Sequence, residues 1–199
     1  MNHLTPEEIS EATVYGESFR RLVDNQQLPD SIRTRASVAC LGIAQDHHHG
    51  ILLLLSNSLY ASAFALARPT FESYIRGQWL TACASDAWVS KFVRGMEPPR
   101  IGTMIAELEA TATFDSAVRS RIHRDKWNAL CGYTHSGGIH AQRWQSGTTI
   151  QPCYEREEVL EVLEFAEMIS GLSTIGILTQ SSDLKAAEAA LEIFRQRFQ

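Results

Sequence analysis

The sequence predicts an all-α fold, a bundle of about six to seven helices that occupies one domain over residues 1–199. Apolar residues recur at helical spacing along most of the chain, and no segment keeps the strict alternation of a β-strand. Several helix starts also carry capping residues. With 44% hydrophobic and 21% charged residues, the composition is that of an ordinary globular domain.

The first helix is expected to begin at Thr5 and to end near residue 25. Thr5 can cap the helix, Pro6 fits its first turn, and Glu8 completes a capping box. Its apolar stripe is only partial, which predicts that residues 1–27 pack on one side, as an arm. A second helix is expected from about residue 30 to residue 55, before the polar break at residues 56–58.

The third helix, expected over about residues 59–84, is rich in alanine and aromatic residues and is apolar on most sides. Such a helix is expected in the middle of a bundle. Pro69 lies inside it and predicts a kink or a local break, because proline removes a helical hydrogen bond. The side chains expected in the core are Phe64, Leu66, Phe71, Trp79 and Leu80.

Five further helices are expected at about residues 86–94, 101–111, 116–133, 155–180 and 182–198. Between two of them, residues 136–154 contain Gly137, Gly138, Gly147 and Pro152, which predicts a long glycine-containing loop. Long loops in compact domains often carry function.

The charge balance argues against a broadly basic, nucleic-acid-binding surface, since the formal net charge is −5. Arginine nevertheless supplies all but three of the 18 basic residues. Its planar fork suits fixed contacts with carboxylate or phosphate groups. A local basic patch therefore stays compatible with the composition.

A cytoplasmic protein without a membrane segment is expected. The N-terminus is polar and acidic, unlike a secretory signal. The most apolar stretch, residues 50–55, is far shorter than the roughly 20 residues that a membrane span needs. Four scattered cysteines without a CxxC pair are expected to be reduced thiols: Cys40, Cys83, Cys131 and Cys153.

Three charged residues of the third helix form the first candidate site. Arg68, Glu72 and Arg76 are four residues apart, so they share one helix face. On so apolar a helix they must be paired or must line a groove. Two interpretations stay open: an arginine oriented by a carboxylate in a binding pocket, or an ion-pair ladder that holds helices in register.

The second candidate site lies where a helix meets the glycine-containing loop. His135 stands there beside Tyr133 and could act as an acid or base near neutral pH. It could equally cap the C-terminus of its helix. His140 and Arg143, further along the loop, are additional binding candidates. We expect His135 to face one polar groove together with Arg68.

Two other clusters have simpler interpretations. His47, His48 and His49 are consecutive, so on a helix they point in different directions and cannot all ligate one metal ion. No metal or cofactor is expected, although His48 or His49 could line the groove. The basic residues of the segment 119–126 are typical of a solvated helix face, with an RNA or phosphate contact as the alternative.

The segment Leu66-Ala67-Arg68-Pro69-Thr70-Phe71-Glu72, followed by Tyr133-Thr134-His135, resembles a group of uncharacterised bacterial helical proteins. These look like distant relatives of the HEPN superfamily and of AbiV-type abortive-infection proteins. The resemblance covers roughly residues 32–165. It implies an HEPN-like helical bundle, often dimeric, with a polar site between helices. A homodimer is also expected from the apolar third helix and from two aromatic residues expected to be exposed, Trp88 and Trp144.

Two functions follow from these features. One is a non-catalytic module that binds a small ligand, nucleic acid or protein partner through the groove, in phage defence or a toxin–antitoxin-like system. The other is a metal-independent HEPN-like ribonuclease, with His135 as acid or base and Arg68 stabilising phosphate charge. HEPN ribonucleases place an arginine a short fixed distance before a histidine. Here Arg119 is too close to His123 and Arg124 too far from His135, which favours the first function.

Overall fold

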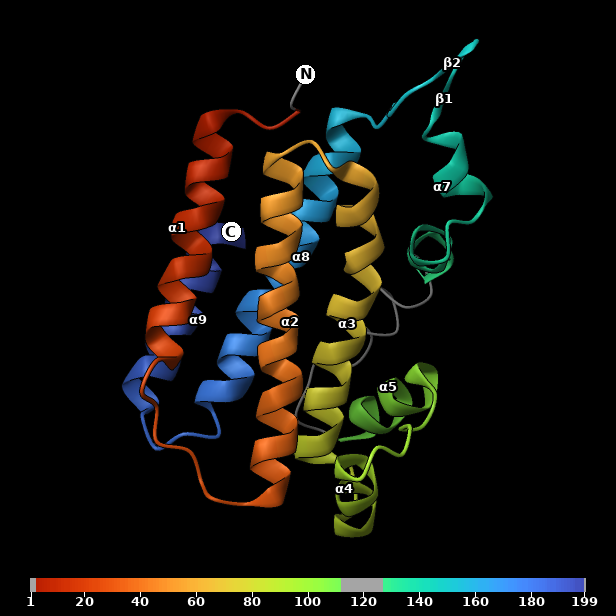
Figure 1. Cartoon of the computed structure of the whole chain (residues 1–199). Helices are drawn as coiled ribbons and strands as arrows, with labels where there is room; N and C mark the ends of the chain where they lie inside the picture. Colours follow the sequence, from red (N-terminus) through yellow and green to blue (C-terminus); the bar gives the residue numbers. More distant parts are fainter. Residues whose placement is uncertain (1–2, 112–126, 199) are drawn as a thin grey trace.

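The structure is a computed structural model that describes residues 3–111 and 127–198. It is an all-α bundle in which two long central helices, α2 and α3, pack with α8 behind them (Figure 1). α1 and α9 cover one side, and α4, α5 and α7 lie on the other (Figure 1). The helices are α1 (Pro6–Val23), α2 (Ile32–Ser56), α3 (Tyr60–Ala82), α4 (Asp86–Val93), α5 (Ile101–Ala110), α7 (Gly138–Gln142), α8 (Arg156–Leu178) and α9 (Leu184–Phe198), and residues 127–134 are also helical.

The centre of the bundle is the pair α2 and α3, joined by a three-residue turn. Ser58 in this turn has a positive φ of 58°. The two helices approach closely at Gly77, where an added Cβ atom would lie 2.6 Å from Cγ of Leu41. Any larger side chain at position 77 would push the helices apart.

The core confirms the predicted position of α3. Phe64, Phe71, Trp79 and Leu80 are each at most 2% exposed, and Leu66 is partly buried. The apolar sides of α3 are covered within this chain, by α2, α5 and α8. Trp88, expected to be exposed, instead packs against the core with its ring 6.1 Å from that of Trp79. Trp144 is 41% exposed, as expected.

The start of α1 confirms the predicted capping box. The Thr5 hydroxyl accepts from the amide of Glu8 at 3.2 Å, and the Glu8 carboxylate accepts from the amide of Thr5 at 2.8 Å. Glu8 also pairs with Arg156 of α8 at 2.6 Å, and this contact holds the pKa of Glu8 below its usual value. Because α1 packs along α8 and α9, residues 6–23 form one side of the bundle.

The segment predicted as a long loop contains short regular elements. α7 is followed by a two-stranded antiparallel hairpin of β1 (Gln145–Ser146) and β2 (Thr149–Ile150), with Gln145 opposite Ile150. Gly147 makes the turn with a φ of +60°, which favours glycine. Of the helix predicted at 116–133, only the end is described, and the basic residues at 119–126 lie outside the described residues.

Among the described residues, none of the helices combines the length and the apolar character that a membrane crossing requires.

Candidate functional site

A polar cavity of about 680 Å³ lies beside the middle of α3. One wall is the charged face of that helix, with Arg68, Glu72 and Arg76. The opposite wall is residues 97–104, which contain the rigid Pro98-Pro99 connector and the first turn of α5. Trp127 also lines the cavity. We call this cavity the polar groove.

Glu72 is shared by two arginines in the polar groove. One of its carboxylate oxygens accepts from Nε of Arg68 at 2.7 Å, and the other accepts from Nη2 of Arg76 at 2.7 Å. The three side chains are 21%, 15% and 29% exposed for Arg68, Glu72 and Arg76 respectively. Solvent therefore reaches the ladder, while its geometry is fixed by charge-assisted hydrogen bonds.

His135 contacts this ladder through Arg68, as expected, although it is not one of the residues that line the polar groove. Nη1 of Arg68 lies 2.7 Å from Nε2 of His135, although 67 residues separate them. A guanidinium can only donate, so Nε2 must be unprotonated to accept this bond. Arg68 also stacks over Trp127, 4.8 Å from the ring centre. The Arg68 side chain is thus fixed by three different groups.

Pro69 helps to bring the two halves of this site together. Of the kink or local break expected there, the break does not occur, and α3 continues through Pro69. Proline cannot donate to the carbonyl four residues earlier, which is that of Ala65. That carbonyl instead lies 3.2 Å from the hydroxyl of Thr134, which also lies 2.9 Å from the carbonyl of Leu130. Thr134 thereby satisfies the freed carbonyl and places the neighbouring His135 next to Arg68.

The other candidates from the sequence lie outside the polar groove. Tyr133 packs edge-on against Phe64, with ring centres 5.0 Å apart. His140 is buried, and its Nδ1 lies 2.7 Å from the backbone carbonyl of Tyr133. Arg143 forms an ion pair with Glu158 of α8. Of the four predicted binding residues, only Arg76 lines the groove.

The consecutive histidines of α2 are also remote from the groove. His48 is completely buried and packs against α1 at Gly16, where an added Cβ atom would lie 2.9 Å from its ring. Neither ring nitrogen has a hydrogen-bond partner among the described residues. Burial, together with the nearby His49, lowers the pKa of His48 to about 3. Within the same described part of the chain, no cluster of potential ligands could hold a metal ion.

The wall of the polar groove opposite α3, which includes Glu97 and Arg100, was not anticipated, and neither was Trp127. Arg100 is the N-cap residue of α5, and Trp127 belongs to the 127–134 helix. One signal in the sequence points to Arg100. Pro98-Pro99 stands directly before a helix start, and the restricted backbone of the two prolines limits the directions that the next residue can take. Nothing in the local pattern indicates that this connector faces Arg68 and Arg76.

The chain was compared with known proteins. A family model described as a family of unknown function, DUF6988, matches residues 41–199, which include the whole polar groove. Comparison with curated proteins and with solved structures finds no match. The match covers most of the chain, and the protein therefore belongs to DUF6988, a family of unknown function.

Proposed function

We propose that this protein is a binding module that holds a phosphate-bearing ligand in the polar groove. The observation that carries the proposal is the charge of the groove. Among the described residues it is lined by three arginines, Arg68, Arg76 and Arg100, and by two glutamates, Glu72 and Glu97. The groove is thus positive by one charge on a chain whose formal net charge is −5. Such a local excess attracts anions.

The arrangement of the arginines supports a phosphate rather than a simple counter-ion. Glu72 uses one oxygen for Arg68 and one for Arg76, so both guanidinium planes are oriented before a ligand arrives. Each guanidinium retains further N–H donors beyond those bonds. Two oriented forks can bind phosphate oxygens with two parallel bonds each. The first turn of α5 lines the same cavity and adds the positive end of a helix dipole.

The contact between Arg68 and His135 favours binding over catalysis. A general base needs a free lone pair, and the Nε2 lone pair of His135 is engaged by Arg68. In this arrangement His135 orients the arginine. The same contact is the specific observation behind the second candidate function, a metal-independent ribonuclease. If Arg68 moved onto a phosphodiester, Nε2 of the exposed His135 would be released beside it.

Binding can be tested with pyrophosphate and with a short single-stranded RNA as probes, by titration calorimetry at low salt. Arg76→Gln removes a groove charge, and Arg94→Gln, which is exposed and outside the groove, is the matched control. We expect Arg76→Gln to weaken binding at least about tenfold, as for loss of a charge-assisted pair. Equal weakening by Arg94→Gln, or no binding of either probe by the wild type, would refute the proposal.

Catalysis is tested separately by incubating the protein with end-labelled RNA in the presence of a chelator. Binding without cleavage is expected. RNA fragments ending in a 2′,3′-cyclic phosphate, formed by the wild type and not by His135→Ala, would instead establish the ribonuclease.

A further inference from the structure

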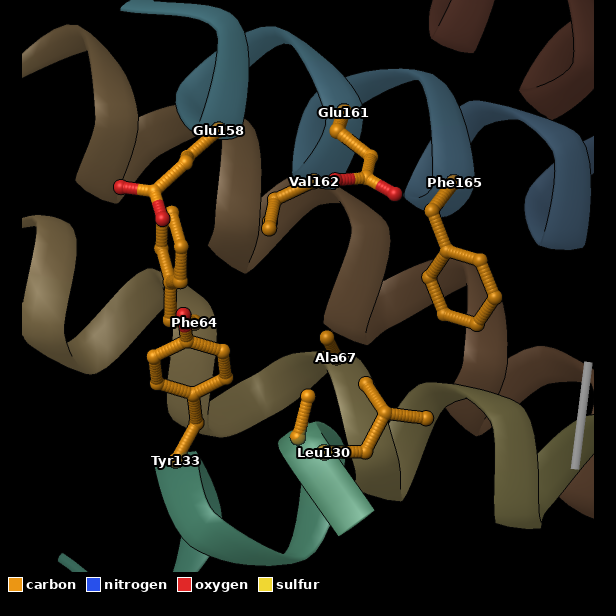
Figure 2. A pocket seen from close by; sticks show the side chains of 9 residues that line it. Phe64, Ala67, Leu130, Tyr133, Glu158, Glu161, Val162 and Phe165 are labelled. Carbon is orange, nitrogen blue, oxygen red and sulfur yellow. The ribbon is translucent and has the colours of Figure 1, made fainter. Parts of the chain in front are cut away.

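A smaller cavity lies between α3, the 127–134 helix and α8 (Figure 2). Its volume is about 150 Å³. Most of its lining is apolar or aromatic and comes from all three helices, including Phe64, Ala67, Ala129, Leu130, Tyr133 and Phe165. We call this cavity the apolar pocket. None of the described residues lines both this pocket and the polar groove, so the two sites are independent.

The aromatic walls of the apolar pocket are held in place by neighbouring rings. Phe64 packs edge-on against Tyr133, with ring centres 5.0 Å apart, and its centre also lies 4.8 Å from that of Tyr154. The ring of Phe165 lies 6.2 Å from that of the buried Phe71. Because these rings are fixed by core contacts, the pocket is formed before any ligand arrives.

Two small side chains leave the space between these rings. Ala67 lies on the α3 wall of the pocket (Figure 2), and Ala129 lies on the wall formed by the 127–134 helix. A void between packed helices costs free energy, because the atoms that line it lose dispersion contacts. A ligand that fills the apolar pocket restores these contacts, so the free energy of packing favours its binding.

The two carboxylates that line the apolar pocket do not favour a charged ligand. Glu158 is paired with Arg143, and Glu161 has an interaction of its own within the chain. A cation therefore finds no carboxylate without a partner, and an anion is repelled by both. The pKa of the Tyr133 phenol is raised, chiefly because this side chain is withdrawn from water. The pocket thus suits a neutral ligand.

We infer that the apolar pocket binds a small neutral molecule with a single aromatic ring. An apolar cavity of about 150 Å³ is the size that accepts one benzene-like ring in protein interiors. Water competes poorly for such a space, because apolar walls offer it few hydrogen bonds. The rings of Phe64, Tyr133 and Phe165 can pack edge-to-face or offset against the ring of the ligand.

Three probes separate the apolar body of the ligand from its charge. Toluene is neutral, benzylammonium is a cation at pH 7, and benzoate is an anion at pH 7. All three contain one benzene ring with a small substituent. A pocket that selects a neutral ring should therefore prefer toluene to both charged probes, because an ionised group loses its hydration there without gaining a partner.

The experiment is a titration of the ¹⁵N-labelled full chain with each probe in parallel, followed by amide chemical shifts. For a ligand of this size we expect saturable binding of toluene with a Kd of about 1 mM or tighter. Benzylammonium and benzoate should each bind at least about fivefold more weakly. No saturable binding of toluene up to about 3 mM would overturn the inference, as would a charged probe that binds as tightly as toluene.

Two variants test whether the ring occupies this pocket. Ala129→Leu places a branched side chain in the space from the 127–134 helix. Ala106→Leu, at an exposed position of α5 outside the pocket, is the matched control. We expect Ala129→Leu to weaken toluene binding at least about tenfold and Ala106→Leu to leave it unchanged. Wild-type affinity in Ala129→Leu, or equal weakening in both variants, would overturn the assignment.

The wild-type protein locates the site without relying on the fold of a variant. Toluene should shift the backbone amides of Ala67, Leu130 and Val162, which lie on the three helices that line the pocket. If none of these three amides shifts at saturation, toluene binds elsewhere and the assignment is overturned.

Discussion

The two sides of the bundle both contain arginine–glutamate clusters, but only one of them has a completely buried carboxylate. On the side covered by α1 and α9, Arg197 of α9 donates from Nε and Nη2 to the two carboxylate oxygens of Glu167, each at 3.0 Å. Glu167 is completely buried. On the other side, Glu72 is 15% exposed and divides its two oxygens between Arg68 and Arg76.

The two clusters differ in the ratio of arginines to glutamates and in how far the central carboxylate is exposed to water. Arg197 donates two bonds to Glu167, which joins α8 to α9, and it also lies 3.5 Å from the exposed Glu11, so this cluster has more carboxylates than cations. The Tyr15 hydroxyl of α1 donates to the backbone carbonyl of Glu167 at 3.3 Å. Such a closed cluster holds helices together. Burial raises the pKa of Glu167, and Arg197 lowers it. The groove cluster has more cations than carboxylates and faces water, which suits the capture of an anion.

The largest loss of stability is expected at the buried cluster of Glu167 and Arg197. Glu167→Ala leaves the Arg197 guanidinium partly buried without its carboxylate, and we expect a loss of about 3–5 kcal/mol in the free energy of unfolding. Urea denaturation measures it. The control is Glu11→Ala, because Glu11 is 67% exposed and lies 3.5 Å from the same arginine. A loss below about 1 kcal/mol for Glu167→Ala would show that the pair does not hold α8 and α9 together.

On the same side of the bundle, the buried His48 makes the stability of the protein depend on pH. The pKa of His48 is about 3 in the folded protein and 6.5 as a free group. Between these values the unfolded chain binds a proton that the folded chain does not, so stability falls as the pH drops below about 6.5. His48→Leu removes this proton linkage, and since no partner is lost, it should not destabilise the protein near pH 7.5.

The measurement is urea denaturation of both proteins across this pH range. The advantage of His48→Leu over wild type should grow by about 1.4 kcal/mol for each pH unit below 6.5. Comparing the two proteins cancels the contributions of other groups, including Glu167. A pH-independent difference would mean that His48 is accessible to protons in the folded state.

A smaller loss of stability is expected on the open side. Glu72→Ala removes the carboxylate shared by Arg68 and Arg76, but that carboxylate is 15% exposed rather than completely buried, and Arg68 keeps its contacts with His135 and Trp127. We expect a loss of about 1–2 kcal/mol in the free energy of unfolding, clearly less than for Glu167→Ala. If Glu72→Ala and Glu167→Ala cost the same free energy of unfolding in this experiment, the two clusters would not differ in how much they stabilise the fold.

The smallest expected effect concerns how the 127–134 helix docks onto α3. Thr134→Val keeps the shape and removes the hydroxyl that lies against the carbonyl of Ala65. Pro69 leaves that carbonyl without a helical donor, so we expect a loss of about 1 kcal/mol and weaker binding in the polar groove. Thr134→Ser retains the hydroxyl and is the control. Unchanged stability and binding in Thr134→Val would show that the docking does not depend on this bond.

Local sequence patterns were sufficient to predict most of the helices and the charged face of α3. The capping box of α1 depends on residues three positions apart, and the ladder of Arg68, Glu72 and Arg76 depends on the four-residue period of one helix. His135 was expected to reach Arg68 because a helix that ends in a glycine-containing loop can turn its last side chains inward, and the contact is present. Neither the proposed function nor a dimer follows from these contacts, and both stay predictions.

What the sequence determined by itself was therefore the class of fold, the helical core and the charged face of α3, because each depends on side chains within a few residues of one another. Only the tertiary structure decided that α3 passes unbroken through Pro69, since the compensating hydroxyl of Thr134 comes from another helix. It also decided that Arg100 and Trp127 face Arg68, and that Tyr133 and Arg143 do not. These contacts depend on how distant segments dock, and docking is selected by the packing of whole helix faces rather than by any local pattern.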